Sequence, residues 1–167
     1  MDVPRQGDLQ VSEDLSFQRR EFAAERVGWA LIALTVAASL LGLLGGSGPF
    51  ATATAGDAAS GVRAEYERLT HVQRPTSLRL EAVAGPDERE VGLEIGSGYL
   101  DRVTVAGVSP EPERLEATPD GVRYVFAAEP GSTLSVVLSI EADRPGSAHA
   151  EVRRGDRRVS FTQFAFP

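Results

Sequence analysis

The sequence predicts a mainly β protein, in which one N-terminal transmembrane helix precedes a single antiparallel β-sandwich of about eight strands. An uncharged stretch of twenty residues runs from Val27 to Gly46, and as a helix it would cross the roughly 30 Å hydrocarbon core of a bilayer. After Gly61 the apolar residues recur at every second position, which is typical of strands with one face against a core. The frequent turns favour a sandwich of the Ig-like or jelly-roll type.

The composition excludes several kinds of chemistry. The chain has 167 residues, no cysteine, and 17 basic residues that are all arginine. The lack of cysteine excludes disulfides and thiolate ligands, and the lack of lysine excludes Schiff bases. The net charge is −7, and residues 47–167 hold thirteen arginines against eighteen acidic residues, so we expect no nucleic acid partner. The many arginines, alanines and glycines are typical of a GC-rich bacterial genome.

The residues before the apolar stretch predict a cytoplasmic segment. Residues 1–11 are expected to form a disordered tail. Residues 12–26 predict a juxtamembrane amphipathic helix, with Ser12 as N-cap and acidic residues in its first turn. One face of this helix carries apolar residues that recur every seven positions, namely Leu15, Phe22 and Trp29. That face either lies at the membrane interface or docks against another membrane protein.

The placement of arginine predicts the orientation of the transmembrane helix, residues 27–46. Arg19, Arg20 and Arg26 lie just before it, and no basic residue follows it until Arg63. Cytoplasmic flanks carry the excess of arginine. We therefore expect the N-terminus in the cytoplasm and the C-terminal part outside the bacterial inner membrane.

Two other interpretations of the apolar stretch fit its surroundings less well. A buried core helix would need a larger protein around it than the rest of this chain provides. A cleaved signal peptide would use the small residues "ATATA" at 51–55. Signal peptides begin with a short basic region, whereas 26 residues that include six acids precede the stretch here. We therefore expect an uncleaved anchor.

Small residues recur every four positions within the predicted span, at Ala38, Gly42 and Gly46. Because small residues let two helix backbones approach closely, this row is a candidate packing face. The expected partners are the lipid bilayer and either another integral membrane protein or a second copy of the chain.

The remaining sequence predicts a linker and one domain. Residues 47–61 are small and polar, which is typical of a flexible linker. Residues 62–167 predict the extracytoplasmic β-sandwich, with clear alternation at 90–95 and 133–142. Glycine and proline clusters between such segments indicate turns.

The register of the last hairpin follows from the sequence. Gly155 and Asp156 suit a two-residue hairpin loop. This loop places Val152 opposite Val159, and the apolar pairs then share one face, which supports the register.

The same register gathers four arginines at the hairpin tip. Two like-charged pairs lie opposite each other, Arg153 with Arg158 and Arg154 with Arg157. Such pairs destabilise a sheet, so anionic groups are expected to offset them. Those groups come either from nearby acids, such as the "SPEPERLE" segment at 109–116, or from an anionic partner. Such a partner is a lipid headgroup, a cell-wall polymer or an acidic protein.

No residue pattern indicates a catalytic centre. His71 and His149 lie on different predicted segments, without partners at metal-ligand spacing. We expect no catalytic residue, no metal and no cofactor. The predicted function is a non-enzymatic, membrane-anchored interaction module, either an accessory subunit or an envelope sensor. The alternatives are a membrane-tethered hydrolase that uses unlocated Asp and Glu residues, and a sandwich that binds sugar or lipid.

Three segments resemble an uncharacterised family of small bacterial inner-membrane proteins. They are "DLSFQRREFAAERVGWALIALTVAASLLGLLGGSGP", "VRAEYERLTHVQRPTSLRLEA" and the terminal "FAFP". The resemblance implies a short cytoplasmic tail, one transmembrane helix and a β-rich outer domain. It implies no particular activity.

Overall fold

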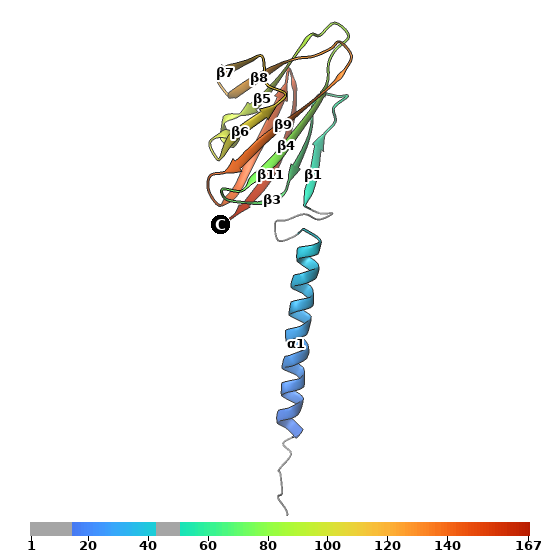
Figure 1. Cartoon of the computed structure of the whole chain (residues 1–167), viewed down its shortest axis with the longest axis vertical. Coiled ribbons are helices and arrows are strands. Elements are labelled where there is room, and N and C mark those ends of the chain that lie inside the picture. Colours follow the sequence, from blue (N-terminus) through green and yellow to red (C-terminus); the bar gives the residue numbers. More distant parts are fainter. Residues whose placement is uncertain (1–14, 43–50) are drawn as a thin grey trace, which may run out of the picture. The chain divides into compact units, whose positions relative to one another are not determined.

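The structure, a computed structural model, describes residues 15–42 and 51–167, with side chains from residue 22 onward in the first range (Figure 1). The chain divides into an N-terminal helical unit and a β unit, and each is described by itself. Strands make up most of the described chain. The predicted mainly β class, with one apolar helix near the N-terminus, is confirmed.

Helix α1, Leu15–Leu40, is continuous, so the predicted juxtamembrane helix and the predicted span are one element. The prediction that this helix runs to Gly46 is wrong. Gly42 has a left-handed φ of 81°, and its N–H donates to the carbonyl of Ser39 at 3.0 Å. Such a glycine caps and ends a helix. The segment Phe22–Leu40 is long and apolar enough to cross a membrane.

The β unit consists of two sheets that pack as a sandwich. The strand orders are β1-β2-β4-β9-β6 and β3-β11-β10-β5-β8-β7. The described residues contain eleven strands rather than about eight, together with the one-turn helix α2, Ser97–Leu100. The Ig-like or jelly-roll type stays a prediction. The strands are β1 Thr52–Gly56, β2 Arg63–Glu67, β3 Leu69–His71, β4 Pro75–Val83, β5 Glu90–Gly96, β6 Val103–Ser109, β7 Arg114–Thr118, β8 Gly121–Ala127, β9 Thr133–Ala142, β10 Gly146–Arg154 and β11 Arg157–Phe166.

The core lies between the sheets, and the period-two alternation builds it. Every second residue of β4 and of β9 is buried, because successive strand side chains point to opposite faces. Burial of one large apolar side chain contributes about 1.5–3 kcal/mol, against at most about 1 kcal/mol for an exposed ion pair. The inner faces therefore hold the fold together. The buried core side chains include Leu78, Leu80, Leu93, Ile95, Val136, Leu138, Ile140, Val152 and Phe161.

The β unit begins earlier than predicted, because part of the expected flexible linker is a strand. Strand β1 pairs antiparallel with β2 along its whole length, from Thr52 opposite Glu67 to Gly56 opposite Arg63. Threonine is β-branched and favours strands, and every second residue of this segment is alanine. Ala53 is buried. Alanine is only weakly apolar, so the alternation is easy to overlook.

Strand β3 is an exception to the predicted antiparallel arrangement. It pairs parallel with the end of β11, with Leu69 opposite Phe164 and His71 opposite Phe166. The chain crosses from one sheet to the other at Arg68, directly after β2. Such a crossing cannot be read from local alternation, since it depends on which distant strand lies at the edge.

The predicted register of the last hairpin is confirmed. Strands β10 and β11 place Val152 opposite Val159, Arg153 opposite Arg158 and Arg154 opposite Arg157. Gly155 has a φ of 55°, which a glycine at the first position of a two-residue loop adopts without strain.

We predict that Gly121→Ala destabilises the β unit by about 2 kcal/mol or more, because a Cβ there would lie 2.0 Å from the carbonyl oxygen of Ile95. The matched control is Gly98→Ala, whose Cβ would meet nothing within 4 Å. This control is expected to leave stability unchanged or slightly raised, since alanine favours helices. Urea unfolding of the full chain in detergent, followed by circular dichroism, measures both. Equal stability of the two variants would contradict the packing described here.

Candidate functional site

The most organised polar surface of the β unit is a row of charged residues across the outer face of the six-stranded sheet. Each member lies directly opposite the next on the neighbouring strand, from β11 to β7. The row alternates in sign except at its β11 end, where two arginines meet. In order, the members of this charge ladder are Arg158, Arg153, Glu94, Arg123 and Glu116.

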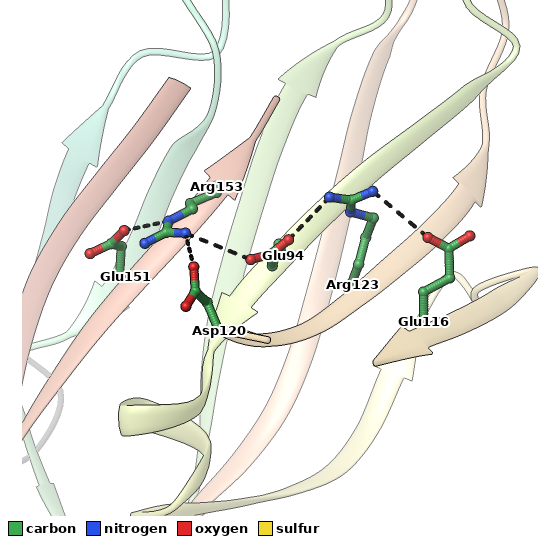
Figure 2. A network of polar contacts seen from close by, with 6 residues as sticks. All are labelled: Glu94, Glu116, Asp120, Arg123, Glu151 and Arg153. Atoms are coloured by element: carbon green, nitrogen blue, oxygen red, sulfur yellow. Dashed lines mark hydrogen bonds and ion pairs between the residues drawn. The ribbon is translucent and has the colours of Figure 1, made fainter. Parts of the chain in front are cut away.

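Arg153 lies among three carboxylates (Figure 2). Its Nε donates to Glu151 at 2.5 Å, and its Nη1 donates to Asp120 at 2.6 Å. The same Nη1 lies 3.9 Å from an oxygen of Glu94. These contacts raise the pKa of Arg153 above its ordinary value, chiefly through the hydrogen bonds to Glu151 and Asp120. The fold itself therefore supplies anions to this arginine.

Glu94 is the centre of the ladder and is 8% exposed. Arg123 donates to it at 3.2 Å from the side opposite Arg153, as Figure 2 shows. The stem of Arg123 lies over Gly92, where an added Cβ would come within 3.2 Å of its Cδ. A buried carboxylate needs such partners, because an unpaired charge out of water costs several kcal/mol.

The ladder continues to the edge strand β7. Arg123 lies 3.8 Å from Glu116, and Arg114 donates to Glu116 at 2.9 Å and to Glu90 at 2.7 Å. The hydrogen bond from Arg114 lowers the pKa of Glu90. These groups are exposed, so each pair contributes little to stability by itself.

Arg154 lies on the other face of the hairpin and has its own partners. It donates to Glu88 at 2.6 Å and to the carbonyl of Gly61 at 3.3 Å. Glu88 also accepts the backbone N–H of Gly85 at 2.8 Å. This backbone hydrogen bond, followed by the contacts with Arg154, lowers the pKa of Glu88 below its ordinary value.

The four hairpin arginines thus divide into two kinds. Arg153 and Arg154 are held by acids of the fold, whereas Arg157 and Arg158 are exposed and form no ion pair with a described residue. Acids of the fold, one of the two predicted sources, are confirmed for Arg153 and Arg154, but the segment expected to supply them is wrong. Residues 109–116 do not reach the hairpin directly, because β7 lies three strands away in the sheet.

The membrane-related site residues are only partly described. Phe22, Arg26 and Trp29 are exposed on α1, whereas the side chains of Leu15, Arg19 and Arg20, and all of Gly46, lie outside the described residues. Because the helix is continuous from Leu15 to Trp29, positions seven residues apart lie on the same face of it. The predicted packing row is wrong at its centre, since Gly42 follows the helix whereas Ala38 lies within it.

Two hollows among the described residues of the β unit are small. Between the sheets the structure describes a cavity of about 10 Å³ lined by residues that include Thr76 and Gln163, which is room for about one water. On the outer face of β2 a hollow of about 60 Å³ is lined by residues that include Glu65, Glu67 and Arg79. Ligand pockets usually measure about 300–1,000 Å³. Within the described ranges, no three His, Asp or Glu residues come together in a way that could hold a metal ion.

Comparison of the chain with protein-family models and with curated proteins finds no match. The resemblance to a family of small inner-membrane proteins therefore stays a prediction, and function has to be argued from the chain itself.

Sequence analysis missed the acids of the ladder. Glu94 and Asp120 lie 59 and 33 positions before Arg153 in the chain, so only the sheet topology brings them together. The alternation of its strand indicated that Glu94 points outward. It did not indicate which residues of the neighbouring strands lie opposite Glu94.

We predict that Arg153→Gln lowers the melting temperature of the fold, because Glu151 and Asp120 lose a charged donor and Glu94 loses one of its two arginines. The matched control is Arg158→Gln, directly across the hairpin. It removes only like-charge repulsion, so stability should change by less than about 0.5 kcal/mol. Thermal unfolding of the full chain distinguishes the two variants. A control that is as unstable as Arg153→Gln would contradict the assignment of partners.

We predict that Glu88 stabilises the fold at neutral pH and that this contribution is lost in acid. A carboxylate with a lowered folded-state pKa stabilises the fold above its ordinary value of 4.5, and this stabilisation is lost as the pH falls through the folded-state pKa. Glu88→Gln should therefore lower the melting temperature at pH 7, and this effect should shrink as the pH falls below 4.5. Glu129→Gln, at an exposed position, is the control. A constant difference between wild type and Glu88→Gln from pH 7 to pH 3 would exclude this role.

Proposed function

We propose that the chain is a membrane-anchored interaction module of the bacterial inner membrane, with its β unit outside the cytoplasm. It acts without catalysis, as an accessory subunit or envelope sensor for another integral membrane protein. The observation that carries the proposal is the surface of α1. Large apolar side chains are more than half exposed along it, including Val27, Trp29, Leu31, Leu34 and Leu40. In water such a surface is unfavourable, whereas in a bilayer it is expected.

Strand β1 supports retention of the anchor. A signal peptidase cut after Ala55 would remove four of the five residues of β1. That cut would also expose the edge of β2, with which β1 pairs throughout. An exposed, unpaired strand edge promotes aggregation. The segment that offered a cleavage site is better explained as the first strand of the domain.

The proposed orientation rests on the arginines that precede the span. Three of them lie within the eight residues up to Arg26, and none follows the apolar segment before Arg63. The positive-inside bias then places the N-terminus in the cytoplasm. The resemblance to small inner-membrane proteins implies the same orientation of the chain in the membrane.

The contacts favour an interaction module over the two alternatives. A hydrolase that uses paired acids needs one carboxyl group with a raised pKa. In contrast, the pKa values of Glu88 and Glu90 are lowered from their ordinary values. A sugar-binding face needs a row of exposed aromatic rings. Among the described residues of the β unit, the exposed large aromatic side chain is that of Phe164, at 39%, which by itself does not make a row.

We predict that a photo-crosslinking amino acid at Trp29 captures one defined protein partner in native membranes. Trp29 lies on the same helix face as Phe22, whereas Leu31 lies about 200° around the helix from Trp29. Leu31 is similarly exposed, at 58% against 65% for Trp29, so the same probe there is a matched control that should label lipid only. The adduct is identified by mass spectrometry. An adduct of twice the chain mass would identify a second copy as the partner.

The same membranes test the anchor. The full chain of 17.8 kDa should stay in the membrane pellet after alkaline carbonate extraction, and a reporter fused at residue 167 should be active only outside the cytoplasm. Equal protein capture from Trp29 and Leu31 would contradict a docking face. A shorter soluble chain that begins near Gly56 would contradict the anchor itself.

A further inference from the structure

One end of the β-sandwich contains Ala51, the first described residue after α1 in the β unit, and the other end contains the hairpin tip. The N–H of Arg68 donates to the carbonyl of Ala51 at 2.9 Å, and the N–H of Phe164 donates to the carbonyl of Arg68 at 2.9 Å. Ala51 and Phe164 are therefore both neighbours of Arg68, and Phe164 lies seven residues along β11 from Arg157 at the hairpin tip. Seven strand residues span about 23 Å. Figure 1 shows that the C-terminus lies at the same end as the start of β1. We call this end, where Ala51 enters the sandwich, the linker end.

Covalent geometry keeps the linker end close to the end of α1. From Gly42 to Ala51 the chain has nine Cα–Cα steps, which span at most about 30 Å when fully extended. Once α1 lies in a bilayer, the linker end is held at a high effective concentration at the membrane surface. The hairpin tip is a further 20 Å or so along the strands.

The linker end gathers arginines that have no acidic partner. Four of them lie there, and none forms an ion pair with a described residue, unlike Arg123 and Arg153 of the ladder. Arg144 donates to the backbone carbonyl of Asp101 at 2.7 Å, which leaves its charge uncompensated. Three of the four are exposed and Arg102 is half-buried. The four are Arg68, Arg74, Arg102 and Arg144.

Four acids also lie near this end, as many as the arginines, but their side chains are shorter. Asp101 and Asp143 are exposed, and Asp143 accepts a hydrogen bond from Thr104 at 2.8 Å. Glu67 and Glu141 are half-buried. Arginine side chains are longer than these carboxylate side chains, so their guanidinium groups can reach further toward a surface. This arrangement contrasts with the acidic excess of residues 47–167 as a whole.

An apolar element accompanies the arginines. Phe164 is 39% exposed, and its ring lies 5.1 Å from that of Phe166. The surface beneath is well supported. The buried hydroxyl of Tyr99 donates to Gln163, and Gln163 donates to the carbonyl of Glu67 at 2.8 Å. Exposed aromatic rings combined with basic side chains are typical of surfaces that bind the membrane interface.

We propose that the linker end of the sandwich docks onto the anionic phospholipid headgroups of the leaflet at which α1 ends. The arginines bind the phosphates, and Phe164 enters the headgroup region. The β unit then stands on the membrane with the arginine hairpin directed away from it, where the hairpin and the charge ladder face a partner. This inference rests on the proposed function, because it takes α1 as a membrane anchor.

The test uses the full chain in lipid nanodiscs. The chain has no cysteine, so one dye can be attached at Ser147→Cys or at Asp156→Cys. Ser147 is exposed and lies opposite Phe164 at the linker end, whereas Asp156 lies at the hairpin tip. Energy transfer to a dye on the lipid headgroups reports the distance of each position from the membrane. We expect at least roughly twofold higher transfer at Ser147 in discs of phosphatidylglycerol and phosphatidylcholine, because the positions differ by more than about 20 Å.

Two further comparisons test the docking, one between lipids of different charge and one between variants that lack arginines at different ends. Transfer at Ser147 should fall in discs of phosphatidylcholine alone, and should also fall when sodium chloride is raised to about 0.5 M, which screens the contacts. The double variant Arg74→Gln/Arg144→Gln should lower transfer in the same way. Arg157→Gln/Arg158→Gln, which removes two exposed arginines at the other end, should leave it unchanged.

Three results would overturn the proposal. They are equal transfer at Ser147 and Asp156, equal transfer at Ser147 in both lipids, and an equal effect of the two double variants. A failure of the anchor is recognised separately, because the protein would then elute without discs in size-exclusion chromatography before any fluorescence is measured. A domain that is anchored but not docked thus gives a different result from a domain that is not anchored.

Discussion

In the β10–β11 hairpin, the pairing of Val152 with Val159 determines which side chains face the core and which face solvent. A slip of β10 by one residue would turn Val152 outward and bring Arg153 toward the core face. Burial of an unpaired guanidinium costs several kcal/mol, whereas each buried valine contributes about 1.5–3 kcal/mol. The register is therefore strongly specified. Strands β5 and β3 then pair on either side of this hairpin, so their positions depend on it.

The charge ladder is a consequence of this register rather than the main source of stability. Arg153 meets Glu94 only because β10 lies beside β5, and Arg123 meets Glu94 because β8 lies on its other side. Four of the five members are exposed or half-buried, so each pair contributes little. The exception is Glu94, whose burial makes its two arginines necessary. A charged outer face also keeps the sheet from associating with other sheets.

The two ends of the sandwich carry arginines for different reasons. At the hairpin tip, Arg154 is paired with Glu88, while Arg157 and Arg158 remain exposed. At the linker end, arginines such as Arg74 have no carboxylate partner among the described residues. These ends differ in their distance along the chain from the helix, since nine Cα–Cα steps separate Ala51, at the linker end, from Gly42. The proposed docking and the proposed partner interaction therefore use opposite ends of one domain.

The sequence by itself determined the local features. The uncharged stretch after Arg26 predicted an apolar helix, and the Gly155–Asp156 loop predicted the hairpin register, because both depend on neighbouring residues. The helix end at Gly42 and strand β1 were missed, since a glycine inside an apolar run and an alanine–threonine repeat are weak signals. Only the tertiary structure decided that β3 pairs parallel with β11 and that Glu94, 59 positions before Arg153, is its partner. Pairing of distant strands depends on how two complete sheets bury their inner faces together, and that information is not contained in any local pattern.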